Sequence, residues 1–142
     1  MLISSLNQGP LLVNYLGHGS TEIWRGGLLT SDDALTLSNG VRLSFLVSMT
    51  CLNGMFHDVY TESLAEAVLK AEQGGAVAVW ASSGLTEPGG QAVMDQELVR
   101  LLFGRKVLTL GEATMRAKKV VRDKDIRRTW ILFGDPTTKL KN

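Results

Sequence analysis

The sequence predicts an α/β fold in which a mostly parallel sheet is covered by helices on both faces. Short, almost wholly apolar runs alternate along the chain with segments of helical periodicity, and such runs are typical of strands buried on both faces. The intervening segments are long enough to form the crossover connections that parallel strands require. The four apolar runs are residues 11–16, 45–49, 76–81 and 130–133.

Capping signals and apolar faces predict the helices between these runs. A short helix is expected from about Asp32 to Asn39-Gly40, because acidic residues favour a helix start and Asn-Gly favours a left-handed stop. Thr61 or Ser63 caps the next helix, which ends before Gly74-Gly75. Two further helices are predicted over residues 91–103 and 110–121.

The composition is that of a folded chain with balanced charge. Hydrophobic residues make up 44% of the 142 residues, which is typical of a globular domain with a substantial core. Lys and Arg number 15 against 14 Asp and Glu, and no apolar stretch approaches the ~18 residues of a membrane span. We therefore expect neither nucleic acid nor a membrane as a partner, and one domain, or part of one, over residues 1–142.

The richest run of positive charge lies between Arg116 and Arg128. Asp123 and Asp125 interrupt this run, and no aromatic stacking platform accompanies it. We interpret it as a solvated helix face rather than as a nucleic-acid site.

His18 and Cys51 are the residues best suited to chemistry. Each follows an apolar run at the carboxyl end of a predicted strand, where open α/β sheets hold their ligands. If the two strands are neighbours, their backbones are about 5 Å apart. Cys51 is the only cysteine, so the chain forms no internal disulfide and any thiol chemistry occurs there. A thiol beside an imidazole predicts a cysteine hydrolase.

In the predicted mechanism the Cys51 thiolate attacks a peptide carbonyl, His18 protonates the departing amine, and water hydrolyses the thioester. The main-chain N–H groups of Gly19 and Cys51 are the predicted oxyanion donors, because glycine lets a substrate backbone come close. Adding His57 and Asp58 to the pair gives suitable types of metal ligand, but the spacing matches no metal motif. No metal or cofactor is therefore expected.

His18 and Cys51 lie within two motifs, residues 14–20 (NYLGHGS) and residues 50–56 (TCLNGMF). The first is similar to the histidine motif, and the second to the nucleophile block, of the gingipain family of cysteine peptidases, which are relatives of caspases and legumains. The resemblance spans nearly the whole chain, because three more segments continue it: residues 63–67, 74–79 and 132–136.

The resemblance implies a caspase-like three-layer sandwich that acts as a cysteine endopeptidase, with the catalytic roles on the residues already named. The strand end at Trp80, Ala81 and Ser82 corresponds to a wall of the substrate pocket in the family, although Trp80 is equally suited to packing under a helix. Peptide or protein substrates and a secreted or cell-surface location are implied by the family alone.

Family domains begin with further strands before the histidine strand, whereas this chain starts about one helix ahead of it. We therefore expect the N-terminal strands to be absent and the chain to be the C-terminal portion of a catalytic domain. The open edge of the sheet is then expected to pair with the missing N-terminal half or with a second copy of the chain. Residues that set specificity in the family lie partly in the absent portion.

A non-catalytic assembly or regulatory module stays open as a second class of function. Domains of the wider caspase group also carry a His-Gly block, a Cys block and a terminal strand similar to residues 130–136. Retention of both His18 and Cys51 favours the enzyme, whereas a sheet that lacks its N-terminal strands favours an inactive fragment. His57 stands where the family often has an acidic residue, and we interpret it as a surface loop residue.

Overall fold

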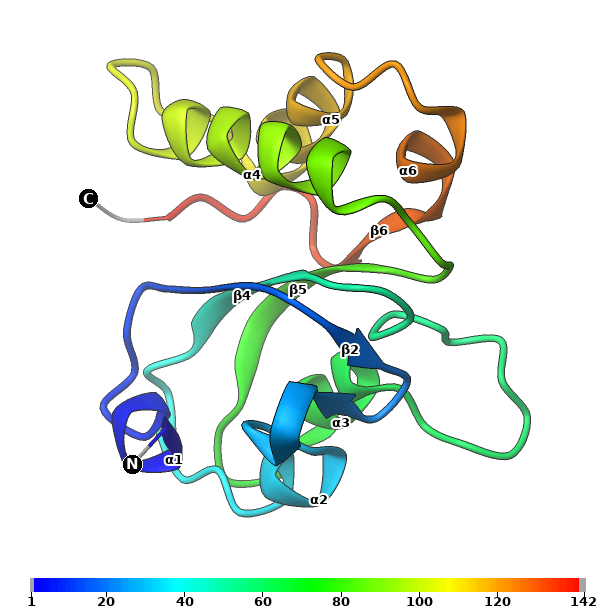
Figure 1. Ribbon diagram of the computed structural model, residues 1–142. Coiled ribbons are helices and arrows are strands. Elements are labelled where there is room, and N and C mark those ends of the chain that lie inside the picture. The colour runs from blue at the N-terminus through cyan, green and yellow to red at the C-terminus, as the bar shows by residue number, and fades with distance from the viewer. Residues whose placement is uncertain (1, 141–142) are drawn as a thin grey trace.

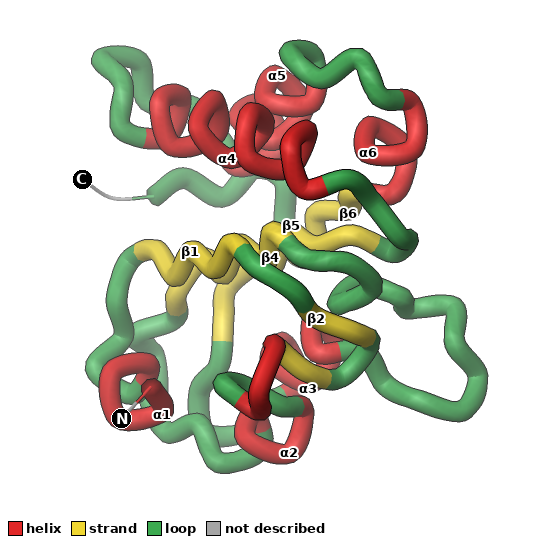
Figure 2. Tube along the Cα trace, viewed as in Figure 1, coloured by secondary structure: helices red, strands yellow, loops and turns green. Residues whose placement is uncertain are grey.

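The fold has three layers, with a central sheet between two layers of helices (Figures 1 and 2). The computed structural model describes residues 2–140. The strands are β1 (Leu12–Leu16), β2 (Gly19–Ser20), β3 (Ile23–Trp24), β4 (Ser44–Met49), β5 (Ala76–Ser82) and β6 (Trp130–Gly134). The α-helices are α1 (Leu2–Leu6), α2 (Ser31–Ala34), α3 (Leu64–Lys70), α4 (Pro88–Leu102), α5 (Leu110–Lys118) and α6 (Lys124–Thr129).

The central sheet has the strand order β1-β4-β5-β6. The first three strands are parallel and β6 is antiparallel to β5, which confirms the predicted mostly parallel sheet. In the β1–β4 pair, Leu12 lies opposite Phe45 and Leu16 lies opposite Met49. The connections that return the chain from β1 to β4 and from β4 to β5 carry α2 and α3 (Figure 1). The carboxyl ends of three neighbouring strands therefore meet at one edge of the sheet.

Two apolar cores lie on opposite faces of the sheet, because successive side chains of a strand point to opposite faces. Phe45, Val47 and Trp80 belong to the core beneath α4, α5 and α6. Leu46 and Val79 belong to the core that α1, α2 and α3 cover. All five side chains are at most 3% exposed. A slip of one residue in register would exchange the two layers, so the apolar pattern fixes the strand pairing.

Three helices begin with capping boxes. Thr30, Ser63 and Thr109 each accept a hydrogen bond from the backbone N–H three residues later, and the acidic side chain at that position accepts one in return. These bonds satisfy N–H groups that the first turn of a helix leaves unpaired. Of the two caps considered for the helix after β4, the structure uses Ser63.

The sequence does not predict α1, the β2–β3 hairpin or α6, because each is too short to show a hydrophobic period. The helix expected from Asp32 to Asn39-Gly40 is reduced to the single turn α2. Asn39 instead donates its amide to the carbonyls of Arg42 and Gly75, at 2.7 and 2.9 Å. Its side chain therefore joins the segments that lead into β4 and β5.

A hydrogen bond between side chains joins β1 to α4 at Asn14 and Asp95. The Asn14 amide donates to both carboxylate oxygens of Asp95, at 2.9 and 3.0 Å. Partial burial raises the pKa of Asp95, and the bond from Asn14 opposes that shift. A carboxyl whose pKa is raised by folding stabilises the fold below its unfolded pKa and loses this contribution as the pH rises through its folded pKa.

We therefore expect Asp95→Asn to raise the melting temperature at pH 7 and to lose that advantage below about pH 4, where the parent carboxyl is protonated as well. Thermal unfolding at both pH values measures the effect, with the exposed Glu72→Gln as the control. An equal gain at both pH values would contradict the prediction.

Candidate active site

His18 and Cys51 follow neighbouring parallel strands at the carboxyl edge of the sheet. His18 and Cys51 each come two residues after Leu16 and Met49, which are the last pair of the β1–β4 register. The Gly17 N–H extends the contact by donating to the Met49 carbonyl at 3.1 Å. The imidazole and the thiol therefore belong to adjoining loops.

The chain turns sharply after Cys51. Leu52 has a φ of 64°, in the left-handed region that residues other than glycine seldom adopt. The Leu52 N–H donates to the Gly84 carbonyl at 3.3 Å, and the Gly54 N–H donates to the Ser82 carbonyl at 2.9 Å. The loop that carries Cys51 is thus fixed to the end of β5 in a strained conformation of the kind found at functional sites.

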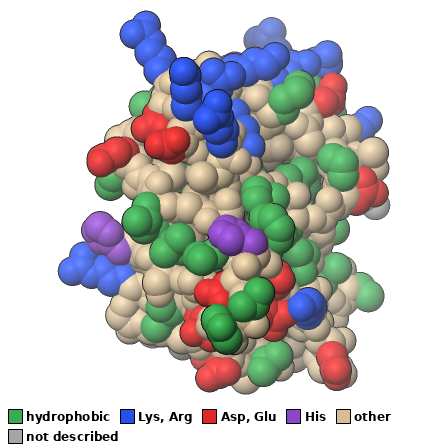
Figure 3. Space-filling model, turned by 90° about the vertical axis from the view of Figure 1, so that its right-hand side faces the viewer, with side chains coloured by type: hydrophobic (Ala, Val, Ile, Leu, Met, Phe, Trp, Pro, Cys, Tyr) green, Lys and Arg blue, Asp and Glu red, His purple; other side chains and the backbone are tan. Residues whose placement is uncertain are grey.

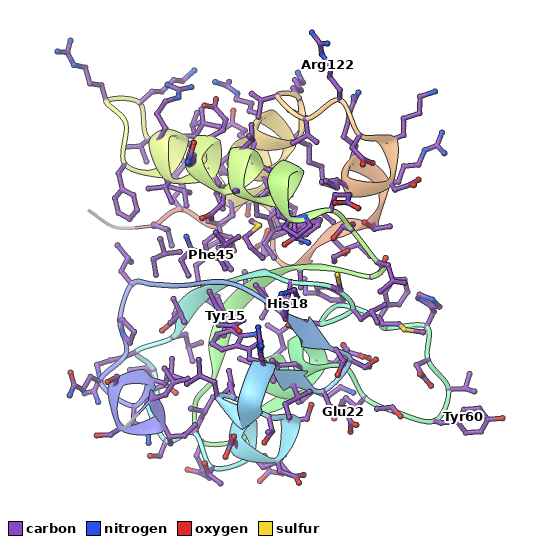
Figure 4. All side chains as sticks on the ribbon, in the orientation of Figure 1. Tyr15, His18, Glu22, Phe45, Tyr60 and Arg122 are labelled. Atoms are coloured by element: carbon purple, nitrogen blue, oxygen red, sulfur yellow. The ribbon has the colours of Figure 1, made fainter. Side chains whose placement is uncertain are left out.

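His18 immediately precedes the β2–β3 hairpin, and its side chain is exposed. Its carbonyl accepts the Arg25 N–H at 2.9 Å and the Tyr15 hydroxyl at 3.1 Å, and Figure 4 shows Tyr15 beside His18. The Tyr15 ring stacks on buried Trp24 with centroids 4.2 Å apart. A Cβ at Gly17 would meet the Tyr15 hydroxyl at 2.6 Å, so a larger residue there would have to displace the Tyr15 side chain. The backbone at His18 is held while the imidazole faces solvent.

Asn53 joins the β2–β3 hairpin, which follows His18, to the loop that carries Cys51, and it is 1% exposed. Its amide nitrogen donates to the Ser20 carbonyl at 2.5 Å and, at a longer 3.5 Å, to the Ile23 carbonyl. Its amide oxygen accepts the hydroxyls of Ser48 and Thr50 at 2.8 and 2.5 Å. Both ends of this buried amide are therefore satisfied. The sequence motifs gave no sign of this role.

Gly19, a predicted oxyanion donor, lies against this network. A Cβ at Gly19 would meet Thr50 Oγ1 at 2.9 Å and Asn53 Oδ1 at 3.0 Å. The close approach explains why glycine follows the histidine. The N–H groups of Gly19 and Cys51 thus stand in the two loops that Asn53 connects, and their role as oxyanion donors stays a prediction.

A pocket of about 370 Å³ opens beside Cys51. The residues that line it are Cys51, Leu85, Thr86, Glu87, Asp123 and Asp125. Three of these residues carry a carboxylate, and none carries a positive charge. The thiol is partly exposed and donates to the Thr86 carbonyl at 3.6 Å. Within residues 2–140 no hydrogen bond joins this thiol to His18, and catalytic hydrogen bonds often tighten only when substrate is bound. Sequence reasoning missed these carboxylates as pocket residues.

Trp80, Ala81 and Ser82 do not form the predicted substrate wall in this structure, because all three are 0% exposed. Trp80 packs edge-on against Trp130, with ring centroids 6.3 Å apart. The Ser82 hydroxyl donates to the Gly84 carbonyl at 3.0 Å. Their burial follows from the position of β5 inside the sheet, covered on both faces. The loop after β5 contributes Leu85, Thr86 and Glu87 to the lining of the pocket beside Cys51.

The charge on the surface is unevenly distributed. Lys and Arg side chains gather over α4, α5 and α6 (Figure 3), and Lys124, Arg127 and Arg128 line a hollow of about 330 Å³ there.

His57 is exposed and packs edge-on against Phe56, with centroids 5.6 Å apart. In the described part of the chain, no cluster of three His, Cys, Asp or Glu side chains is able to hold a metal ion. No helix among the same residues is both long and apolar enough to span a membrane.

Comparison with known proteins places this arrangement in one family. The sequence profile of Peptidase family C25 matches residues 1–141. Gingipain R2 and Gingipain R1 of Porphyromonas gingivalis are each 30% identical to the chain over 149 residues, which covers 96% of it. The crystal structure of the Arg specific cysteine proteinase gingipain R (RGPB) matches 99% of the chain with a TM-score of 0.92 at 28% identity. A complex of the RgpB pro- and mature domains matches 99% with a TM-score of 0.90 at 26% identity.

These matches confirm the family resemblance and the fold class predicted from the sequence. The chain covers only part of each relative: 20% of Gingipain R2, 15% of Gingipain R1 and 35% of the RGPB crystal chain. The chain thus spans about a fifth or less of the curated relatives it matches.

Proposed function

Because the chain belongs to Peptidase family C25, we propose that it carries the catalytic pair of a gingipain-type cysteine endopeptidase. The observation that supports this proposal is the parallel β1–β4 register, whose last pair, Leu16 and Met49, comes two residues before His18 and Cys51 at the carboxyl edge of the sheet. Cys51 is the proposed nucleophile and His18 the proposed acid and base. The substrate is a peptide or protein.

The proposed reaction proceeds through a thioester. The Cys51 thiolate attacks the scissile carbonyl carbon, and the N–H groups of Gly19 and Cys51 donate to the oxyanion that forms. The C–N bond then breaks as His18 gives a proton to the departing amine, leaving the acyl group on the sulfur. His18 next takes a proton from water, and the resulting hydroxide attacks the thioester carbonyl. The C–S bond breaks, the carboxyl product leaves, and the Cys51 thiolate and the protonated His18 are restored.

The pocket beside Cys51 is proposed to receive a basic side chain. Glu87, Asp123 and Asp125 line it, and carboxylates form strong, directional hydrogen bonds with a guanidinium or ammonium group. A volume of about 370 Å³ has room for an Arg or Lys side chain. The RGPB structure that the fold matches is that of an Arg specific proteinase, which supports the same preference.

We expect His18→Ala to slow the alkylation of Cys51 by iodoacetamide at pH 6 about tenfold, because the thiolate is the reactive form and a nearby imidazolium favours it. Intact mass reports the rate at one site, since the chain has a single cysteine. His57→Ala, at an exposed position, is the matched control and is expected to react at the parent rate. Equal rates in the parent and His18→Ala would contradict the peptidase proposal and favour a non-catalytic module or an inactive fragment.

The free edge of β1 is proposed to pair with another strand. β1 ends the described sheet, and Leu16 on it is 52% exposed. Edge strands with unpaired backbone groups invite such pairing, and the RgpB complex joins pro- and mature domains of a related protein. Sedimentation of the chain alone distinguishes the two possible partners of this edge. A dimer is expected if a second copy of the chain pairs with β1, and a monomer is expected if the partner is an N-terminal segment.

A secreted or cell-surface location is proposed from the family resemblance. Fractionation of cells that produce the protein tests this proposal, and recovery only from the cell interior would contradict it.

A further inference from the structure

We propose that Asn53 is a positioning residue that holds His18 in place for reaction at Cys51. The proposal rests on the peptidase function proposed above and concerns how the two halves of the site are held together. His18 and Cys51 stand in separate loops, and the strand register ends before either residue. A further link is needed beyond the last paired residues, and Asn53 provides it.

The link runs from the backbone of one loop to the side chains of the other. Asn53 donates to the carbonyls of Ser20 and Ile23, which are opposite residues of the β2–β3 hairpin. It accepts hydroxyl donors from Ser48 in β4 and from Thr50, the residue next to Cys51. The side-chain amide of Asn53 therefore holds the β2–β3 hairpin against the carboxyl end of β4.

The network extends to the base of the hairpin and to α3. Trp24 Nε1 donates to the Ser48 hydroxyl at 2.8 Å, so the hairpin and β4 are joined at a second point. At the start of α3, the Leu64 N–H donates to the Thr21 carbonyl at 2.8 Å and the Ala65 N–H donates to the Asn53 carbonyl at 3.0 Å. The first turn of α3 therefore holds both loops, and Asn53 takes part in this contact through its own backbone carbonyl.

The hydrogen-bond partners around the side chain of Asn53 match an amide better than a carboxylate. Asparagine offers two donors and an acceptor on one short side chain, which matches two carbonyls on one side and two hydroxyls on the other. Aspartate has the same shape but would direct a carboxylate oxygen at the Ser20 and Ile23 carbonyls. Because Asn53 is 1% exposed, water has no access to replace a lost bond.

A second buried asparagine in the chain serves as a matched control. Asn39 is 3% exposed and, like Asn53, donates to two backbone carbonyls, those of Arg42 and Gly75. It lies before β4 and β5 begin, at the end of the sheet opposite to Cys51. Asn39→Asp and Asn53→Asp therefore make the same chemical change at similar burial, but only the second touches the loops of the site.

The experiment measures how strongly the alkylation rate of Cys51 at pH 6 depends on His18 in each background. The rate of the parent is compared with that of His18→Ala, and the comparison is repeated with Asn53→Asp and with Asn39→Asp. We expect Asn53→Asp to lose most of the roughly tenfold dependence on His18 and Asn39→Asp to retain it. Thr50→Val, which removes one hydroxyl donor to Asn53, is expected to lose part of it and serves if Asn53→Asp does not fold.

The outcomes separate this proposal from the function on which it rests. Equal retention of the His18 dependence in the Asn53, Thr50 and Asn39 variants would overturn the positioning role and leave the peptidase proposal standing. Equal loss in the Asn39 and Asn53 variants would also overturn it, because the effect would then follow general destabilisation. Absence of any His18 dependence in the parent would overturn both proposals.

Discussion

Replacing Asp123 and Asp125 together by Asn is expected to lower kcat/KM about 30- to 150-fold for peptides cut after Arg or Lys. Hydrogen bonds to charged groups contribute about 1.5–3 kcal/mol each, and the exposure of both carboxylates reduces their joint effect to about 2–3 kcal/mol. Asn at position 123 preserves the α6 cap, because its side-chain oxygen accepts the same N–H groups from Asp125 and Ile126. The loss should therefore fall on substrate recognition rather than on the fold.

Peptide hydrolysis with matched substrates measures this effect. Peptides that differ only in having Arg, Lys or norleucine before the scissile bond are compared in the parent, the double variant and Glu72→Gln, an exposed carboxyl outside the pocket lining. Cleavage after norleucine, and all cleavage by Glu72→Gln, should match the parent. An equal loss for basic and neutral peptides would show that the two carboxylates support the loop and not the substrate.

The strands, and the edge of the sheet that carries His18 and Cys51, could be predicted from the sequence because both depend on the local pattern of apolar residues. The runs at residues 11–16, 45–49, 76–81 and 130–133 became β1, β4, β5 and β6 with shifts of one residue at most. The direction of β6 was not readable, since the preceding α6 is a charged segment in which only Ile126 is buried. Short elements of this kind are held by tertiary contacts that leave no periodic signal.

The sequence indicated the residues of the candidate site that lie at strand ends. It did not indicate the residues that join the site through contacts between segments far apart in the chain. His18 and Cys51 are recognisable because each follows a buried strand between small residues. Asn53 gives no such signal, since its partners Ser20 and Ile23 are 33 and 30 positions away in the chain. Asp123 reaches the pocket from a loop that the sequence indicated only as a break in positive charge.

The misplaced substrate wall has a similar cause. A tryptophan at the end of an apolar strand fits equally well at a pocket mouth or beneath a helix. β5 has a neighbouring strand on each side and helices over both faces, so Trp80 is enclosed completely. Local sequence does not report how many layers cover a strand, and this decides between the two placements.

Gly75→Ala is expected to destabilise the fold by about 2–5 kcal/mol, and its paired substitution Gly89→Ala is expected to stabilise it by about 0.5 kcal/mol. Gly75 has a φ of +95°, and a Cβ there would meet the Val68 carbonyl oxygen at 2.1 Å. The Gly75 N–H also donates to Asn39 at 2.7 Å, so a shift of the backbone would loosen that buried amide. The double glycine that the sequence indicates as a helix stop is therefore also a close-packed entry to β5.

Gly89 provides the opposite case within the same chain. It follows Pro88 in the first turn of α4, its φ is not positive, and a Cβ would meet no atom within 4 Å. Alanine there reduces the freedom of the unfolded chain without strain in the folded one. Chemical denaturation of both variants measures the pair, and thermal unfolding should show a fall of about 10 °C for Gly75→Ala against a small rise for Gly89→Ala. Small effects of the same sign would mean that the turn before β5 relaxes freely, and that Asn39 and Val68 do not fix the path of the chain into the central strand.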